Sequence, residues 1–114
     1  MKKENLYEEI ITELNYFNFK KNSTSYQYLI DVIYIVVDKK MIVKNFKNNI
    51  YPLIAKKYET KPENVLWCIS KMIKLMYLNT DNKKIKEYFN IENGENPSTK
   101  AFILYISYKI LKDF

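Results

Sequence analysis

The chain has 114 residues, 47% of them hydrophobic and 28% charged, which is the size and composition of one globular domain. We expect that domain to span residues 1–114. The formal net charge is +6, and all 19 basic residues are lysine because the sequence contains no arginine. Histidine is absent too, which removes the commonest general base and the commonest metal ligand. The lone Cys68 cannot form an internal disulfide, which favours a reducing compartment.

Several classes of protein are excluded by missing patterns. The charged start of the chain does not match a signal peptide, and no segment approaches the ~20 apolar residues of a membrane helix. We therefore expect a cytoplasmic protein without membrane contact, and the many Asn, Lys, Ile and Tyr residues indicate a low-GC bacterium. Paired carboxylates, glycine-rich phosphate loops and metal-ligand clusters are all missing, so we predict no enzyme, no cofactor, no metal and no small-molecule substrate.

Apolar residues at helical spacing predict an all-α fold of six helices. The first is expected over residues 4–16. A polar loop over 17–24 follows, and Ser25 is expected to cap a second helix over 26–38, which is apolar enough to be the central one. The third is expected over 43–58. Pro52 lies within it, so this helix is expected to start close to Pro52 or to be kinked there.

The fourth helix has the clearest start signal. Thr60 and Glu63 have the spacing of a capping box, and Pro62 suits the first turn of a helix that continues past Met76. A fifth helix is expected over 81–89. After a loop over 90–97, Ser98 or the residue that follows it is expected to cap the last helix, whose apolar positions include residues 102, 103, 106 and 110.

The third and fourth helices, over about 43–77, have the arrangement of a helix-turn-helix, in which the second helix enters the DNA major groove. Between residues 44 and 74 there are seven lysines and two glutamates, a charge of +5 out of the total of +6. A localised basic field of this kind is typical of phosphate binding. The alternative is that these lysines only form the solvated faces of helices in a lysine-rich protein, and the pattern alone leaves both open.

The sequence resembles a known family over nearly its whole length. The similarity is clearest at residues 26–29 (YQYL), 50–58 (IYPLIAKKY), 62–65 (PENV) and 96–98 (NPS). These segments resemble the C-terminal effector domain of the sporulation-initiation response regulators, the stage-zero sporulation protein A family. The resemblance implies a six-helix bundle, unrelated to winged helices, that binds DNA and works as a dimer on paired sites.

Two departures from the family pattern affect what the resemblance implies. The first expected helix begins almost at residue 1, so we expect a chain without the family's receiver domain and without its switching by phosphorylation. The resemblance also places the family's base-reading side chains at Asn64, Leu66, Trp67 and Ser70, and none of these four residues is of the family's charged type. We therefore expect the fold to be kept and the base preference to be altered or relaxed.

The leading interpretation is a transcription regulator that binds double-stranded DNA. The residues expected to contact DNA are Lys56, Lys57, Lys61, Asn64, Trp67, Ser70, Lys71 and Lys74. The alternative is an antagonist or adaptor that has lost DNA reading and binds a sporulation regulator or another factor through Leu66 and Trp67. Besides DNA, the expected partner is a second copy of the chain in a homodimer or a regulator protein.

Trp67 decides between these interpretations, and its position can be predicted. Helical spacing from Val65 and Ile69 directs Trp67 away from the core and places Leu66 at the edge of the core. An exposed tryptophan is typical of an interaction site. The alternative is that a shift of the helix places Trp67 under a neighbouring segment.

Overall fold

The computed structural model describes residues 3–39, 46–92 and 94–112, and within these ranges it is all-helical, without a strand. Its helices are α1 (Lys3–Leu14), α2 (Thr24–Lys39), α3 (Phe46–Asn49), α4 (Tyr51–Lys57), α5 (Pro62–Asn79), α6 (Asn82–Phe89) and α7 (Thr99–Lys112). The all-α prediction is therefore confirmed. Val43, where the third helix was expected to start, and Lys44 lie outside the described residues.

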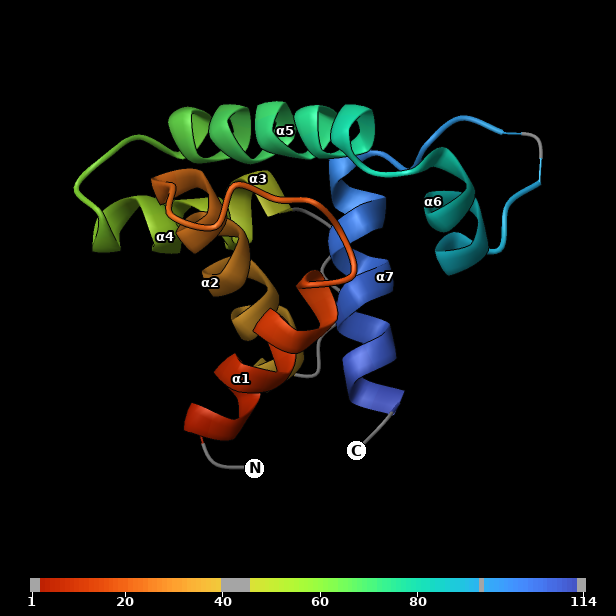
Figure 1. Ribbon diagram of the computed structural model, residues 1–114. Helices are drawn as coiled ribbons and strands as arrows, with labels where there is room; N and C mark the ends of the chain where they lie inside the picture. Colours follow the sequence, from red (N-terminus) through yellow and green to blue (C-terminus); the bar gives the residue numbers. More distant parts are fainter. Residues whose placement is uncertain (1–2, 40–45, 93, 113–114) are drawn as a thin grey trace.

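The helices form a bundle in which α5 lies across one end (Figure 1). Helix α2 packs against α7, α5 and α1, and α7 also contacts α1 and α5. Both α2 and α7 begin beside α5 and run away from it, so the start of α1 and the end of α7 lie at the far side of the bundle from α5. Within the described ranges, this arrangement leaves one long side of α5 uncovered.

The expected third helix is divided into two segments, α3 and α4, which meet at Ile50. Proline lacks the N–H that would donate to the carbonyl four residues earlier, and its ring clashes with that carbonyl. Pro52 therefore interrupts the helix at its own first turn, where Leu53 and Ile54 donate their backbone N–H groups to the Ile50 carbonyl at 3.0 and 3.3 Å. The expected start or kink close to Pro52 is confirmed, and it takes the form of a break between two helical segments.

The helix starts are capped by short polar side chains, though not always by the expected ones. Ser23, and not Ser25, caps α2, because its Oγ accepts the backbone N–H of Tyr26 at 3.1 Å. Ser98 caps α7 by accepting the N–H of Ala101 at 3.2 Å, and Asp81 caps α6 by accepting the N–H of Lys83 at 2.9 Å. Each cap satisfies one of the N–H groups that a helix start leaves without a partner.

The core includes a segment that was expected to be only a polar loop. Phe17 and Phe19 lie between α1 and α2, and both are buried. The ring of Phe17 is packed among other aromatic rings, with centroids 5.2 Å from Phe102, 4.9 Å from Tyr88 and 5.9 Å from Phe89. This cluster joins the loop to α6 and α7, so the loop conformation is fixed by the core.

Candidate nucleic-acid interface

Helices α4 and α5 are joined by a tight turn over residues 58–61. The backbone N–H of Thr60 donates to the Ala55 carbonyl at 2.9 Å, and the N–H of Glu59 donates to the Lys56 carbonyl at 3.4 Å. These are the two hydrogen bonds of a Schellman motif, which ends a helix with one residue in the left-handed region. Glu59 occupies that position with a φ of 54°. The turn therefore holds α5 at a fixed angle to α4.

Replacing Glu59 by glycine should raise the free energy of unfolding by about 0.5–1 kcal/mol, because an L side chain is strained at positive φ and glycine is not. Urea unfolding of the two proteins measures the difference. Asn90→Gly is the matched control, since Asn90 ends α6 with a φ of 55°. Asparagine tolerates this conformation, so the control should gain much less, and equal gains would contradict the explanation.

The predicted capping box at the start of α5 is not formed. The residue that precedes the helix is Lys61, whose side chain makes no capping hydrogen bond, and Pro62 occupies the first turn as expected. Thr60 lies one position too early to cap. Its Oγ1 instead accepts a hydrogen bond from the Asn64 side-chain Nδ2 at 3.0 Å. Asn64 is thus held at the exposed start of α5.

The outer face of α5 carries the exposed side chains of Asn64, Trp67, Lys71 and Lys74. Trp67 is 61% exposed, so its predicted direction away from the core is confirmed, and it does not lie under a neighbouring segment. The Lys71 Nζ lies 4.8 Å from the centre of the Trp67 ring, a cation–π distance. Aromatic and cationic groups are therefore combined on one exposed helix face.

Ser70 and Leu66 lie off this outer face. Ser70 Oγ accepts a hydrogen bond from Thr99 Oγ1 at 2.9 Å, so the side chain faces the start of α7 and not the open side of α5. Ser70 is nevertheless half-exposed and lines a groove together with Trp67, so its contact with DNA stays a prediction. Leu66 is half-buried and packs against the core, at its edge as predicted.

The lysines near the turn are not equivalent. Lys57 Nζ lies 3.1 Å from a carboxylate oxygen of Asp31, which is buried in α2. The Tyr58 hydroxyl donates to the same oxygen at 2.5 Å. Burial and this hydrogen bond together raise the pKa of Tyr58 above its usual value. Lys57 is thus paired with Asp31. Lys56 and Lys61 are exposed, and neither forms an ion pair within the described part of the chain.

The Asp31 cluster was not predicted. Asp31 interrupts the apolar run of residues 29–37, and an acid inside a buried helix requires a partner. That interruption is the one sequence signal that could have indicated the cluster. Which lysine pairs with Asp31 depends on how α4 packs against α2. The sequence pattern does not show this packing.

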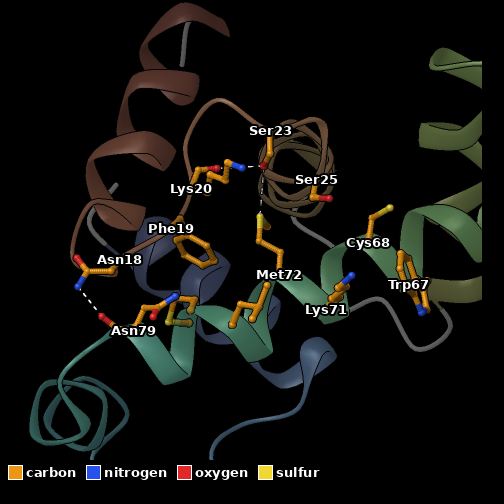
Figure 2. A pocket seen from close by; sticks show the side chains of 12 residues that line it. Asn18, Phe19, Lys20, Ser23, Ser25, Trp67, Cys68, Lys71, Met72 and Asn79 are labelled. Carbon is orange, nitrogen blue, oxygen red and sulfur yellow. Dashed lines mark hydrogen bonds between the residues drawn. The ribbon is translucent and has the colours of Figure 1, made fainter.

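Trp67 lies between two grooves. One, of about 340 Å³, runs between α5 and the segment before α2, with Phe19, Met72 and Met76 among its lining (Figure 2). The other, of about 320 Å³, is lined by Pro62, Glu63, Leu66, Trp67 and Ser70. No cluster of three metal-ligating side chains occurs in the described ranges, and none of the helices described there has the length and apolarity to cross a membrane.

The sequence of this chain matches a known protein family. A family model described as the sporulation initiation factor Spo0A C terminal matches residues 9–110. The chain belongs to this family. The match covers the whole candidate interface, from the Ser23 cap to the Ser98 cap.

Membership of the Spo0A C-terminal family assigns the chain to the DNA-binding effector domains of sporulation regulators, which are not an enzyme family. In this family member, the uncovered side of α5 carries Trp67, Lys71 and Lys74, and α4 ends beside it with Lys56. The family's helix pair is therefore present with an exposed and basic outer side.

Proposed function

We propose that the protein is a DNA-binding transcription regulator of the cytoplasm whose base preference differs from that of the other Spo0A C-terminal domains. The observation that supports this most directly is the exposed face of α5, where Lys71 and Lys74 accompany an exposed Trp67 on the side of the helix that no described part of the bundle covers. Family membership supports the mode of binding. The uncharged side chains of Asn64, Leu66 and Trp67, at positions where the resemblance implies charged base readers, support the change in preference.

In this proposal α5 enters the major groove with its first turns. Lys56, Lys61, Lys71 and Lys74 contact phosphates, and such contacts position a protein on the duplex without reading its sequence. Asn64 is suited to adenine, and Trp67 is suited to a thymine methyl group. Arginine, the usual reader of guanine, is absent from the sequence, so we expect a preference for AT-rich sites.

The test is fluorescence anisotropy with a labelled duplex that carries the family's promoter box and with a scrambled duplex of the same composition, over a salt series. Binding that weakens steeply with salt indicates phosphate contacts, at a slope of about −0.9 per contact. Equal binding to both duplexes supports a changed preference. No affinity for either duplex contradicts the proposal.

Trp67→Ala should weaken binding to the preferred duplex about tenfold, the loss expected for one large apolar contact of about 1.4 kcal/mol. The salt slope should stay the same because no charge is removed. Leu78→Ala is the control, since Leu78 is the most exposed large apolar residue of α5 and lies at its far end. Equal losses from the two substitutions would argue against a base contact by Trp67.

A second candidate function is an antagonist or adaptor that binds a regulator protein, or a second copy of this chain, through Leu66 and Trp67. The exposed Leu75 and Leu78 extend the apolar surface of Trp67 along α5, which favours a protein partner. Because Trp67 is the one tryptophan of the sequence, its fluorescence reports binding at this face. A response to a purified sporulation regulator, with none to DNA, supports the second candidate over the first.

A further inference from the structure

The groove between α5 and residues 18–25 differs from the other two grooves in its charge. Its polar lining residues are Asn18, Lys20, Ser23, Ser25, Lys71 and Asn79, together with Cys68. All of these can donate hydrogen bonds, and no carboxylate is among them. By contrast, Glu63 lines the second groove, and Glu87 and Glu92 line the groove beside α6. Of these three, the groove beside residues 18–25 alone favours an anionic occupant on both of its walls.

Contacts with the C-terminal half of α5 fix the position of this segment. The Asn18 side chain donates from Nδ2 to the Asn79 carbonyl at 2.7 Å, and the Asn18 backbone N–H donates to Thr80 Oγ1 at 3.0 Å. Farther along, the Ser23 hydroxyl lies 3.9 Å from the Met72 sulfur (Figure 2). Lys20, between these anchors, is therefore held at a constant place relative to α5.

Lys20 and Lys71 stand on the two walls of this groove without a counter-charge. Lys20 and its neighbour Lys21 are exposed, and neither forms an ion pair with any residue of the described ranges. Two ammonium groups that face one groove repel each other, and an anion between them removes that repulsion. The floor of Phe19, Met72 and Met76 is apolar and carries no negative charge to balance the two lysines.

We propose that Lys20 and Lys21 grip the phosphates of one DNA strand while α5 lies in the adjacent major groove. This inference rests on the proposed DNA-binding function and adds a contact outside the helix-turn-helix. The two strands flank a helix in the major groove, so their phosphates pass along its sides. The groove shares Trp67 and Lys71 with the exposed face of α5, which makes a continuous path for one backbone. This continuous path favours a DNA strand over an acidic helix of a partner protein as the occupant of the groove.

The test uses the full chain with Lys20→Gln and Lys21→Gln combined, in a salt series with a short AT-rich duplex. Each lost phosphate contact makes the slope of log K against log salt shallower by about 0.9, so the double variant should lose about 1.8. Circular dichroism checks that the helices remain. The charge-matched control combines Lys39→Gln and Lys112→Gln, at the C-terminal ends of α2 and α7, away from α5 (Figure 1).

The outcomes separate this inference from the proposed function. If the parent protein binds with a steep slope, and the Lys20 and Lys21 variant keeps that slope, the inference is overturned and the proposed function stands. If the parent protein does not bind, both fail. A glutamate-rich amphipathic peptide is the second probe. Loss of peptide binding in this variant with unchanged DNA binding would make the groove a protein-docking site and would also overturn the inference.

Discussion

Replacing Phe17 by alanine should lower the free energy of unfolding by about 3–5 kcal/mol, although Phe17 lies in a loop. Phe17 is 1% exposed, and its ring packs against rings from α6 and α7. Removing the ring leaves a cavity. The neighbouring rings cannot fill it, because they are fixed on α6 and α7. Because domains of this size are stable by only about 5–15 kcal/mol, this is a large share of the total. Urea unfolding followed by circular dichroism measures it.

Tyr105→Ala is the matched control for the Phe17 substitution. The Tyr105 ring also contacts this cluster, with its centroid 5.3 Å from that of Phe89, but the side chain is about half exposed. The Tyr105 substitution should lower the free energy of unfolding by roughly 1 kcal/mol, because the ring buries little surface. If Phe17→Ala costs no more than Tyr105→Ala, the loop does not contribute to the core in the way that its packing indicates.

The helices of this protein could be predicted because their buried residues repeat at helical spacing. In α5, Val65, Ile69, Met72, Ile73 and Met76 are buried, as their spacing requires. The same spacing correctly placed Trp67 on the exposed side. Helix period and direction are local properties, so one segment of sequence contains all the information that they need.

The errors arose where the outcome depends on other parts of the chain. Thr60 and Glu63 have capping-box spacing, but the tight turn after α4 places Lys61 at the cap position. Ser70 lies at the border of the outer face, and its hydrogen bond with Thr99 could not be foreseen from helical spacing. Competition between a local signal and a contact from a distant segment cannot be resolved from spacing alone.

The candidate interface was predictable in part for the same reason. The lysines of α4 and α5 are close in sequence, so their cluster is visible there. The pairing of Lys57 with Asp31, 26 positions apart, gives this lysine a partner that the cluster does not reveal. Lys20 reaches α5 through the contacts of Asn18 with Asn79 and Thr80, more than 60 positions away. A basic surface assembled from distant segments becomes apparent only when the chain is folded.

Three tyrosines should make the fold sensitive to alkaline pH. Burial raises the pKa of Tyr51 to about 12, and burial is also the main cause that raises the pKa of Tyr58 and Tyr77. Above pH ~10 these tyrosines lose their protons in the unfolded chain and keep them in the folded protein. The unfolded state is then favoured as pH rises. Stability present below pH 10 should fall by about 1.4 kcal/mol per pH unit for each tyrosine, or about 4 kcal/mol for the three.

Tyr77→Phe separates this effect from general alkaline damage. The Tyr77 hydroxyl donates to the Pro97 carbonyl at 2.9 Å, so its loss should cost about 1 kcal/mol at pH 7. The variant has one ionising hydroxyl fewer, so its free energy of unfolding should fall less steeply above pH ~10 than that of the parent protein. The two slopes should differ by about 1.4 kcal/mol per pH unit. The two stability curves should therefore cross near pH ~11, where the gain from the missing ionisation equals the lost hydrogen bond. Tyr108→Phe, at an exposed ring on α7, is the control and should follow the parent protein throughout. Urea unfolding between pH 7 and pH 12 gives the curves, and parallel curves for Tyr77→Phe and the parent would show that the buried hydroxyl does not control alkaline unfolding.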